Sequence, residues 1–172
     1  MNRLLAPVIA LALLGSVVLA NLLTTYYSLV PAGFGLLVTA GTYAAGLSLG
    51  LRDALQQNGG MRWVLGSIAG GIVLSFAFGN GRIALASAVA FGLGELVDLA
   101  IYTPLRRRDW RAAVAASNAV GALADTLLFL TIAGFPLTEQ AVGGQLLVKA
   151  VFCTALALLV GEGFVRVRKA AS

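Results

Sequence analysis

Long apolar runs, separated by short polar or glycine-rich connections, dominate the pattern along this chain. No residue between Leu4 and Leu51 is charged, which leaves room for two helices of about 20 residues each, the length that spans a bilayer. The pattern predicts six membrane-spanning helices, at Leu4–Leu23, Val30–Leu51, Trp63–Phe78, Arg82–Leu105, Arg111–Ala133 and Gln145–Phe164. We therefore expect one all-α integral membrane domain over residues 1–172, with no linker between separate domains.

The predicted connections are short, and two of them carry clear turn signals. Gly79-Asn80-Gly81 is a tight turn, and Gly134-Phe135-Pro136 ends the fifth helix because proline cannot continue a helix. The first apolar run follows Arg3 and resembles a secretory signal peptide. We expect it to remain as the first span, because further apolar spans follow it. The predicted connections are Thr24–Leu29, Arg52–Arg62, Gly79–Gly81, Arg106–Trp110 and Gly134–Gly144.

The basic residues predict the orientation of these helices. If six spans alternate in direction, most cations fall on one side of the membrane, and Arg82 and Lys149 are the exceptions. Short loops rich in lysine and arginine face the cytoplasm, so we expect both termini to be cytoplasmic. The cations assigned to that side are Arg3, Arg52, Arg62, Arg106, Arg107, Arg108, Arg111, Arg166, Arg168 and Lys169.

Composition narrows the possible functions. Hydrophobic residues make up 59% of the chain and charged residues 11%, well below the roughly 25% that is usual in soluble domains. The net charge of +5 is explained by membrane topology, and we expect no nucleic-acid partner. The chain has no histidine and one cysteine, Cys153, so a histidine-based catalytic or metal site and an intrachain disulfide are excluded. Gly46-Leu47-Ser48-Leu49-Gly50 has nucleophile-elbow spacing, but it lies in an apolar helix with no histidine to activate Ser48. We expect neither an enzyme nor a cofactor.

Four ionisable side chains fall inside the predicted spans: Glu95, Asp98, Asp125 and Lys149. A charge at the centre of a membrane helix costs roughly 2.5–3.5 kcal/mol, so these groups need an internal polar site. Glu95 and Asp98 share one helix face, as do Asn118 and Asp125, and Lys149 could reach Asp125 from the last span. Two simpler interpretations stay open: an Asp125–Lys149 ion pair that only holds helices together, and a Glu95 that is solvated near the interface.

These residues resemble a known family, the queuosine-precursor transporters, also described as vitamin uptake transporters (VUT). The resemblance covers nearly the whole chain and is most specific in its central part, from Arg82 to Phe129. Its central motifs are Gly94-Glu95-x-x-Asp98-x-x-Ile101-Tyr102, Leu105-Arg106-Arg107-Arg108, Ser117-Asn118 and Asp125-Thr126-x-x-Phe129. Further matches are Asn21, Gly41-Thr42, Arg52-Asp53-Ala54-Leu55, Arg82-Ile83, Ser87 and Val148-Lys149.

The resemblance implies a six-helix inner-membrane protein that imports deazaguanine bases used to make a modified tRNA nucleoside. A carboxylate can accept both N–H groups on the edge of such a base, and an aromatic ring can stack on its face. We expect Glu95 or Asp98 to bind the base edge, with a donor from Asn118 or Arg82. The candidate stacking residues are Tyr43, Phe91 and Tyr102, and the candidate gating or coupling residues are Asp125, Lys149, Asn21 and Asp53.

Two other functions stay open. The chain could be the substrate-binding subunit (S-component) of an energy-coupling-factor vitamin or nucleobase importer, with Ala6-x-x-x-Ala10 contacting a partner membrane subunit. It could also be a membrane scaffold that transports nothing, in which case neutralising Glu95, Asp98 and Asp125 would be tolerated. Pairs of small residues such as Gly46 and Gly50 indicate either a homodimer or tight packing within one chain.

Overall fold

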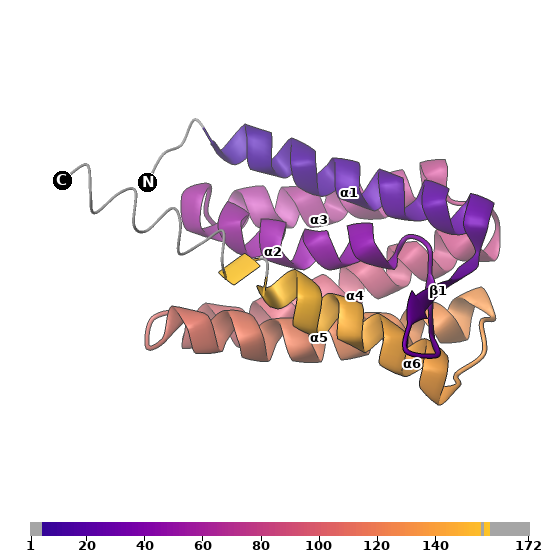
Figure 1. Ribbon diagram of the computed structural model, residues 1–172. Coiled ribbons are helices and arrows are strands. Elements are labelled where there is room, and N and C mark those ends of the chain that lie inside the picture. The colour runs from indigo at the N-terminus through magenta and orange to yellow at the C-terminus, as the bar shows by residue number, and fades with distance from the viewer. Residues whose placement is uncertain (1–4, 156, 159–172) are drawn as a thin grey trace.

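The computed structural model describes residues 5–155, 157 and 158, and within these residues the protein is a bundle of helices with one short hairpin (Figure 1). Long helices lie side by side along a common direction, and their short connections make sequence neighbours antiparallel. The hairpin and α6 lie together at one end of the bundle. The elements in chain order are α1 (Ala6–Tyr27), β1 (Leu29–Gly33), β2 (Leu36–Thr39), α2 (Thr42–Asn58), α3 (Met61–Phe78), α4 (Arg82–Leu105), α5 (Trp110–Ala133), α6 (Glu139–Leu146) and the π-helix η1 (Leu147–Cys153).

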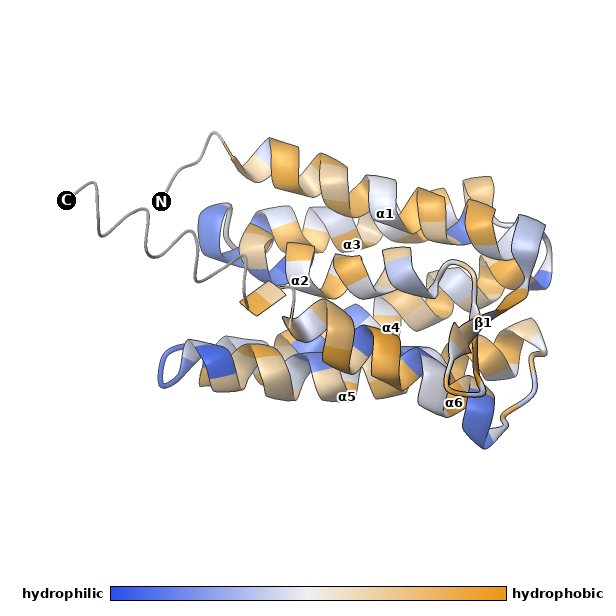
Figure 2. Ribbon diagram, in the orientation of Figure 1, coloured by the Kyte–Doolittle hydropathy of each residue, from blue (hydrophilic) through white to orange (hydrophobic). Residues whose placement is uncertain are grey.

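Four of these helices are long and apolar enough to cross a membrane: α1, α3, α4 and α5. In α4, 56% of the apolar window is buried inside the protein, against 28% in α3 and 33% in α1. The central helix is therefore α4, and the outer faces of α1 and α3 are apolar and exposed. Figure 2 shows polar residues at the two ends of the bundle and between the helices around α4.

The predicted helix Val30–Leu51 is wrong in its first half, which forms the β1–β2 hairpin instead. The strands pair antiparallel with Leu29 opposite Thr39 and Val30 opposite Val38. The turn between the strands has positive φ at Gly33, Phe34 and Gly35, a conformation that a helix cannot contain. A short apolar run is compatible with either a strand or a helix, so hydropathy alone did not separate the two.

The second half of that prediction ends too early. Helix α2 continues through Arg52 to Asn58. These residues were predicted to belong to the loop Arg52–Arg62. Gly59 and Gly60 separate α2 from α3, and Gly60 has a φ of +82°, which a helix does not contain. The polar residues of this last part of α2 were assigned to a loop because of their polarity, but Arg52, Asp53 and Gln56 are buried inside the bundle.

The last predicted helix, Gln145–Phe164, begins earlier than expected. Thr138 caps α6 by accepting a hydrogen bond from the Ala141 backbone N–H at 3.2 Å, so residues expected in a loop are helical. Helix α6 packs closely on β2, because a Cβ on Gly144 would collide with the Leu37 carbonyl oxygen. The predicted end of this helix at Phe164 lies outside the described residues.

The core joins α1, α2, α3 and α4, and two small residues of α1 pack within it. Ala6 and Ala10 are 1% and 6% exposed and belong to this core, and a Cβ on Gly59 would lie 2.9 Å from the Ala6 Cβ. The proposed contact of this alanine pair with a partner subunit is therefore wrong, since both side chains are covered by the chain itself. Gly46 similarly faces Cys153 within the chain, with a built Cβ 2.5 Å from its sulfur.

Candidate functional site

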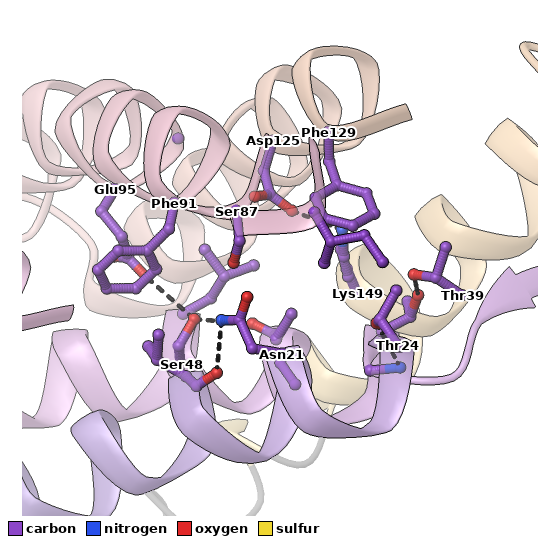
Figure 3. Close-up of a pocket in the computed structure, with 18 residues that line it drawn as sticks. Asn21, Thr24, Thr39, Ser48, Ser87, Phe91, Glu95, Asp125, Phe129 and Lys149 are labelled. Carbon is purple, nitrogen blue, oxygen red and sulfur yellow. Dashed lines mark hydrogen bonds and ion pairs between the residues drawn. The ribbon is translucent and has the colours of Figure 1, made fainter. Parts of the chain in front are cut away.

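A cavity of about 50 Å³ lies between α1, α2, α4, α5 and η1, near the hairpin (Figure 3). Two phenyl rings, of Phe91 and Phe129, contribute to its wall. The volume of the cavity exceeds the roughly 10–15 Å³ that is needed to hold one water molecule, so the cavity has room for water. The polar side chains that line it are Asn21, Thr24, Thr39, Thr42, Ser48, Ser87, Glu95, Asp125 and Lys149.

Helical spacing places these residues on facing stripes. Ser87, Phe91 and Glu95 follow one another at four-residue intervals on α4, so they share one face of that helix. Asp125 and Phe129 share a face of α5 in the same way. The two faces approach closely at Gly94, whose added Cβ would lie 2.9 Å from the Cβ of Asp125.

Lys149 and Asp125 form an ion pair at the cavity wall, as the sequence suggested they could. Lys149 Nζ donates to Asp125 Oδ2 at 2.5 Å and to Gln145 Oε1 at 2.8 Å, and it lies 3.4 Å from Thr126 Oγ1. Lys149 is 3% exposed and Asp125 19% exposed at the side chain, so the carboxylate is the more open partner. Lys149 lies in the π-helix η1, and such local irregularities are frequent at functional sites.

Glu95 is held by two residues of α2. Ser48 Oγ donates to Glu95 Oε1 at 3.1 Å, and Arg52 Nε donates to Glu95 Oε2 at 3.2 Å. Glu95 is 2% exposed, which excludes the interpretation that it is solvated near the interface. Ser48, rejected as a nucleophile, is therefore a hydrogen-bond donor at the cavity wall.

Asn21 brings an unused acceptor to the cavity from α1. Its Nδ2 donates to the Val17 carbonyl at 2.9 Å and lies 3.5 Å from Ser75 Oγ, while its Oδ1 is buried and has no hydrogen-bond partner in the part of the chain that the structure describes. Figure 3 labels Asn21 among the side chains that line the cavity, together with Ser48 and Ser87. A buried acceptor without a donor is costly, so Asn21 is suited to accept a hydrogen bond from a bound molecule.

The other predicted site residues do not line the cavity. Tyr43 and Arg82 are exposed, and Tyr43 is 48% exposed on the outer side of α2. Asn118 Nδ2 donates to Thr154 Oγ1 at 2.9 Å, away from the cavity. The remaining three, Asp53, Asp98 and Tyr102, are buried around Arg52.

Sequence reasoning missed Arg52 as a site residue. Arg52 is 0% exposed and pairs with Asp53, Glu95 and Asp98. A signal was present, because no glycine or proline interrupts the chain between Arg52 and Gly59, so nothing required a loop there. Phe129 was also overlooked as a wall residue, although it stands four residues after Asp125.

Fold and cavity together define a multi-pass helical membrane protein with a cavity between its helices, lined by both polar and apolar side chains. Over residues 8–162 the chain matches the model of a family described as "Putative vitamin uptake transporter". Since this match covers most of the chain, the protein belongs to that family, which is one of transporters and not of enzymes. Among curated proteins and among solved structures, no chain matches this one.

Proposed function

We propose that the protein imports a deazaguanine-type base, a queuosine precursor, through the cavity between α4, α5 and η1. The observation that carries this proposal is the combination of two carboxylates, Glu95 and Asp125, with two phenyl rings in the lining of one cavity. A guanine-like edge offers adjacent N–H donors to a carboxylate, and its flat face packs against aromatic rings. The unused Oδ1 of Asn21 provides one more acceptor.

The size of the cavity indicates that the structure is a closed state. At about 50 Å³ the cavity is well below the roughly 300–1,000 Å³ of typical ligand pockets, so binding of a bicyclic base requires the walls to move apart. The Lys149–Asp125 ion pair joins η1 to α5 at the cavity wall. Breaking this ion pair would let the two helices separate and widen the cavity. Asp125 and Lys149 are therefore proposed to close the site, while Glu95 holds the base.

The proposed setting is the inner membrane, with six spans and both termini cytoplasmic. Exposed cations at the end of the bundle that joins α2 to α3 and α4 to α5 support this orientation, since Arg62, Arg107, Arg108 and Arg111 lie there. Arg82 is the exposed cation at the opposite end among the described residues. A homodimer and a single domain over 1–172 remain part of the proposal, and no nucleic acid is expected as a partner.

Uptake of radiolabelled 7-deazaguanine by cells that lack their own importer tests this function. Glu95→Gln should lower the initial uptake rate about tenfold to a hundredfold, because hydrogen bonds to a charged group contribute about 1.5–3 kcal/mol. Glu139→Gln, in the exposed first turn of α6, is the matched control and should import normally. Immunoblots of membrane fractions confirm equal insertion.

The host strain for this assay should also lack every energy-coupling-factor ATPase. Import in that strain supports a transporter that works alone and excludes the substrate-binding-subunit alternative. If Glu95→Gln imports as fast as the wild type at equal expression, the assignment of the site is wrong.

A further inference from the structure

A second charged cluster lies behind the cavity, and it shares only Glu95 with the cavity wall. We call Arg52, Asp53, Glu95 and Asp98 the Arg52 cluster. Arg52 Nη1 lies 2.7 Å from Asp53 Oδ1, Arg52 Nε lies 3.2 Å from Glu95 Oε2, and Arg52 Nη2 pairs with Asp98 Oδ2. These four residues are 0%, 3%, 2% and 0% exposed, so water does not screen their charges.

The carboxylates of the Arg52 cluster outnumber its positively charged groups. Three carboxylates around one guanidinium leave two uncompensated negative charges if every acid is ionised. Among the described residues Arg106 is the next cation, half-buried with its guanidinium carbon 5.9 Å from the centre of the Tyr102 ring, and counting it leaves one negative charge within this part of the chain. On the cavity side, Asp125 is already neutralised by Lys149. Helix α1 contains no charged residue, and the only one in α3, Arg62, is exposed.

The hydrogen bonding of the Arg52 cluster is also incomplete. Asp53 Oδ2 and Asp98 Oδ1 are buried and have no hydrogen-bond partner among the described residues. An uncompensated buried charge costs several kcal/mol, and a proton shared within a group of close carboxylates removes that cost. One bound proton cancels the excess charge that remains after Arg106 is counted.

We infer that the Arg52 cluster binds one proton that crosses the membrane together with the solute, which makes the protein a proton-coupled importer. This inference rests on the proposed function. In the closed state the cluster is sealed from water, so the protein reaches that state only with the excess charge neutralised. Glu95 links the two sites, since it contacts Arg52 on one side and lines the cavity on the other. The proton enters from outside, is carried as a carboxylic acid, and leaves to the inside, with no change in the solute.

The test uses the full-length protein in liposomes, with radiolabelled 7-deazaguanine and the membrane potential clamped to zero. Counterflow at equal pH measures exchange of the base and so tests the proposed function alone. An outside pH one unit lower then tests coupling, because one proton per base supports about a tenfold accumulation. A sodium gradient at equal pH provides the comparison.

Asp53→Asn separates coupling from binding, since Asp53 does not line the cavity. The asparagine permanently removes the negative charge of residue 53. Binding of a proton to the Arg52 cluster removes one negative charge reversibly. The variant should therefore still exchange the base but lose the tenfold accumulation. Asp53→Glu, which keeps a titratable carboxyl, should restore it, and Glu139→Gln should accumulate like the wild type.

The possible results separate the two proposals. If the wild type exchanges the base but the pH gradient gives no accumulation, or if sodium drives it instead, the inference is overturned. Accumulation by Asp53→Asn equal to that of the wild type would also overturn it. If the wild type shows no exchange at all, the proposed function fails, and the inference fails with it. Should Asp53→Asn not insert into the membrane, the measurement on the wild type decides by itself.

Discussion

Replacing Lys149 by methionine should destabilise the protein by leaving Asp125 as an unpaired charge. Removing one partner of a buried ion pair typically costs 3–5 kcal/mol. Because the Asp125 side chain is 19% exposed, and so partly hydrated, we expect the lower end, about 3 kcal/mol, a shift of about 150-fold in the unfolding equilibrium. Gln145 and Thr126 also lose the ammonium group that they contact.

The double variant Lys149→Met/Asp125→Asn tests the origin of this loss. It removes both charges, so it should recover about 2 kcal/mol relative to Lys149→Met. With Asp125→Asn measured as well, a double-mutant cycle gives the coupling energy of the pair. Unfolding by SDS titration in mixed micelles, followed by tryptophan fluorescence, gives the free energies. Import by the double variant should nevertheless stay at least about tenfold below that of the wild type, because the carboxylate at the cavity wall is gone.

Two results would refute this reasoning. A loss below about 1 kcal/mol in Lys149→Met would show that the pair is not buried as the structure has it. A double variant with both restored stability and normal import would show that the pair only holds α5 to η1. That second result would support the simpler interpretation left open by the sequence.

Three further predictions follow from the packing and the cavity wall. Gly121→Ala would place a Cβ 2.8 Å from the Cβ of Asp98, so it should lower stability by about 1–3 kcal/mol in the same SDS titration, whereas Gly66→Ala, with open space around it, should change little. Phe129→Ala should weaken binding of 7-deazaguanine about threefold to tenfold in equilibrium binding, because a ring that lines the cavity is lost. Tyr43→Ala should leave the uptake rate unchanged, since this side chain lies outside the cavity and is half exposed; a large loss there would mean that the base binds elsewhere.

The sequence predicted the three helices at the centre of the chain well. Observed α4 coincides with its prediction, and α3 and α5 begin within two residues of theirs. These helices have long apolar runs bounded by glycine turns or a basic connection, so hydropathy and breakers agree. The hairpin was missed because its apolar residues resemble the start of a span, although Pro31, Gly33 and Gly35 in the same run are turn residues.

For the site, the sequence did not reveal which neighbouring helix, if any, each polar side chain faces. Helical spacing showed which residues share a face of one helix, and so brought Glu95 and Asp125 to attention. It could not show which helices pack against that face, and therefore it placed Arg52 and Asp53 in a loop with solvated charges. Hydropathy measures the polarity of a side chain but not whether that side chain points to water or into the bundle. Only the packing of α2 against α4 reveals the Arg52 cluster.

The most direct test of the central claim is equilibrium binding of purines, deazapurines and vitamins to the purified wild-type protein and to Glu95→Gln. The central claim is that carboxylates of the spanning helices converge on a cavity that binds the solute. It predicts that a deazaguanine-type base binds the wild type, and that Glu95→Gln binds it at least about tenfold more weakly. Equal affinity in both proteins would contradict the claim, since the carboxylate at the centre of the cavity wall would then have no part in recognition.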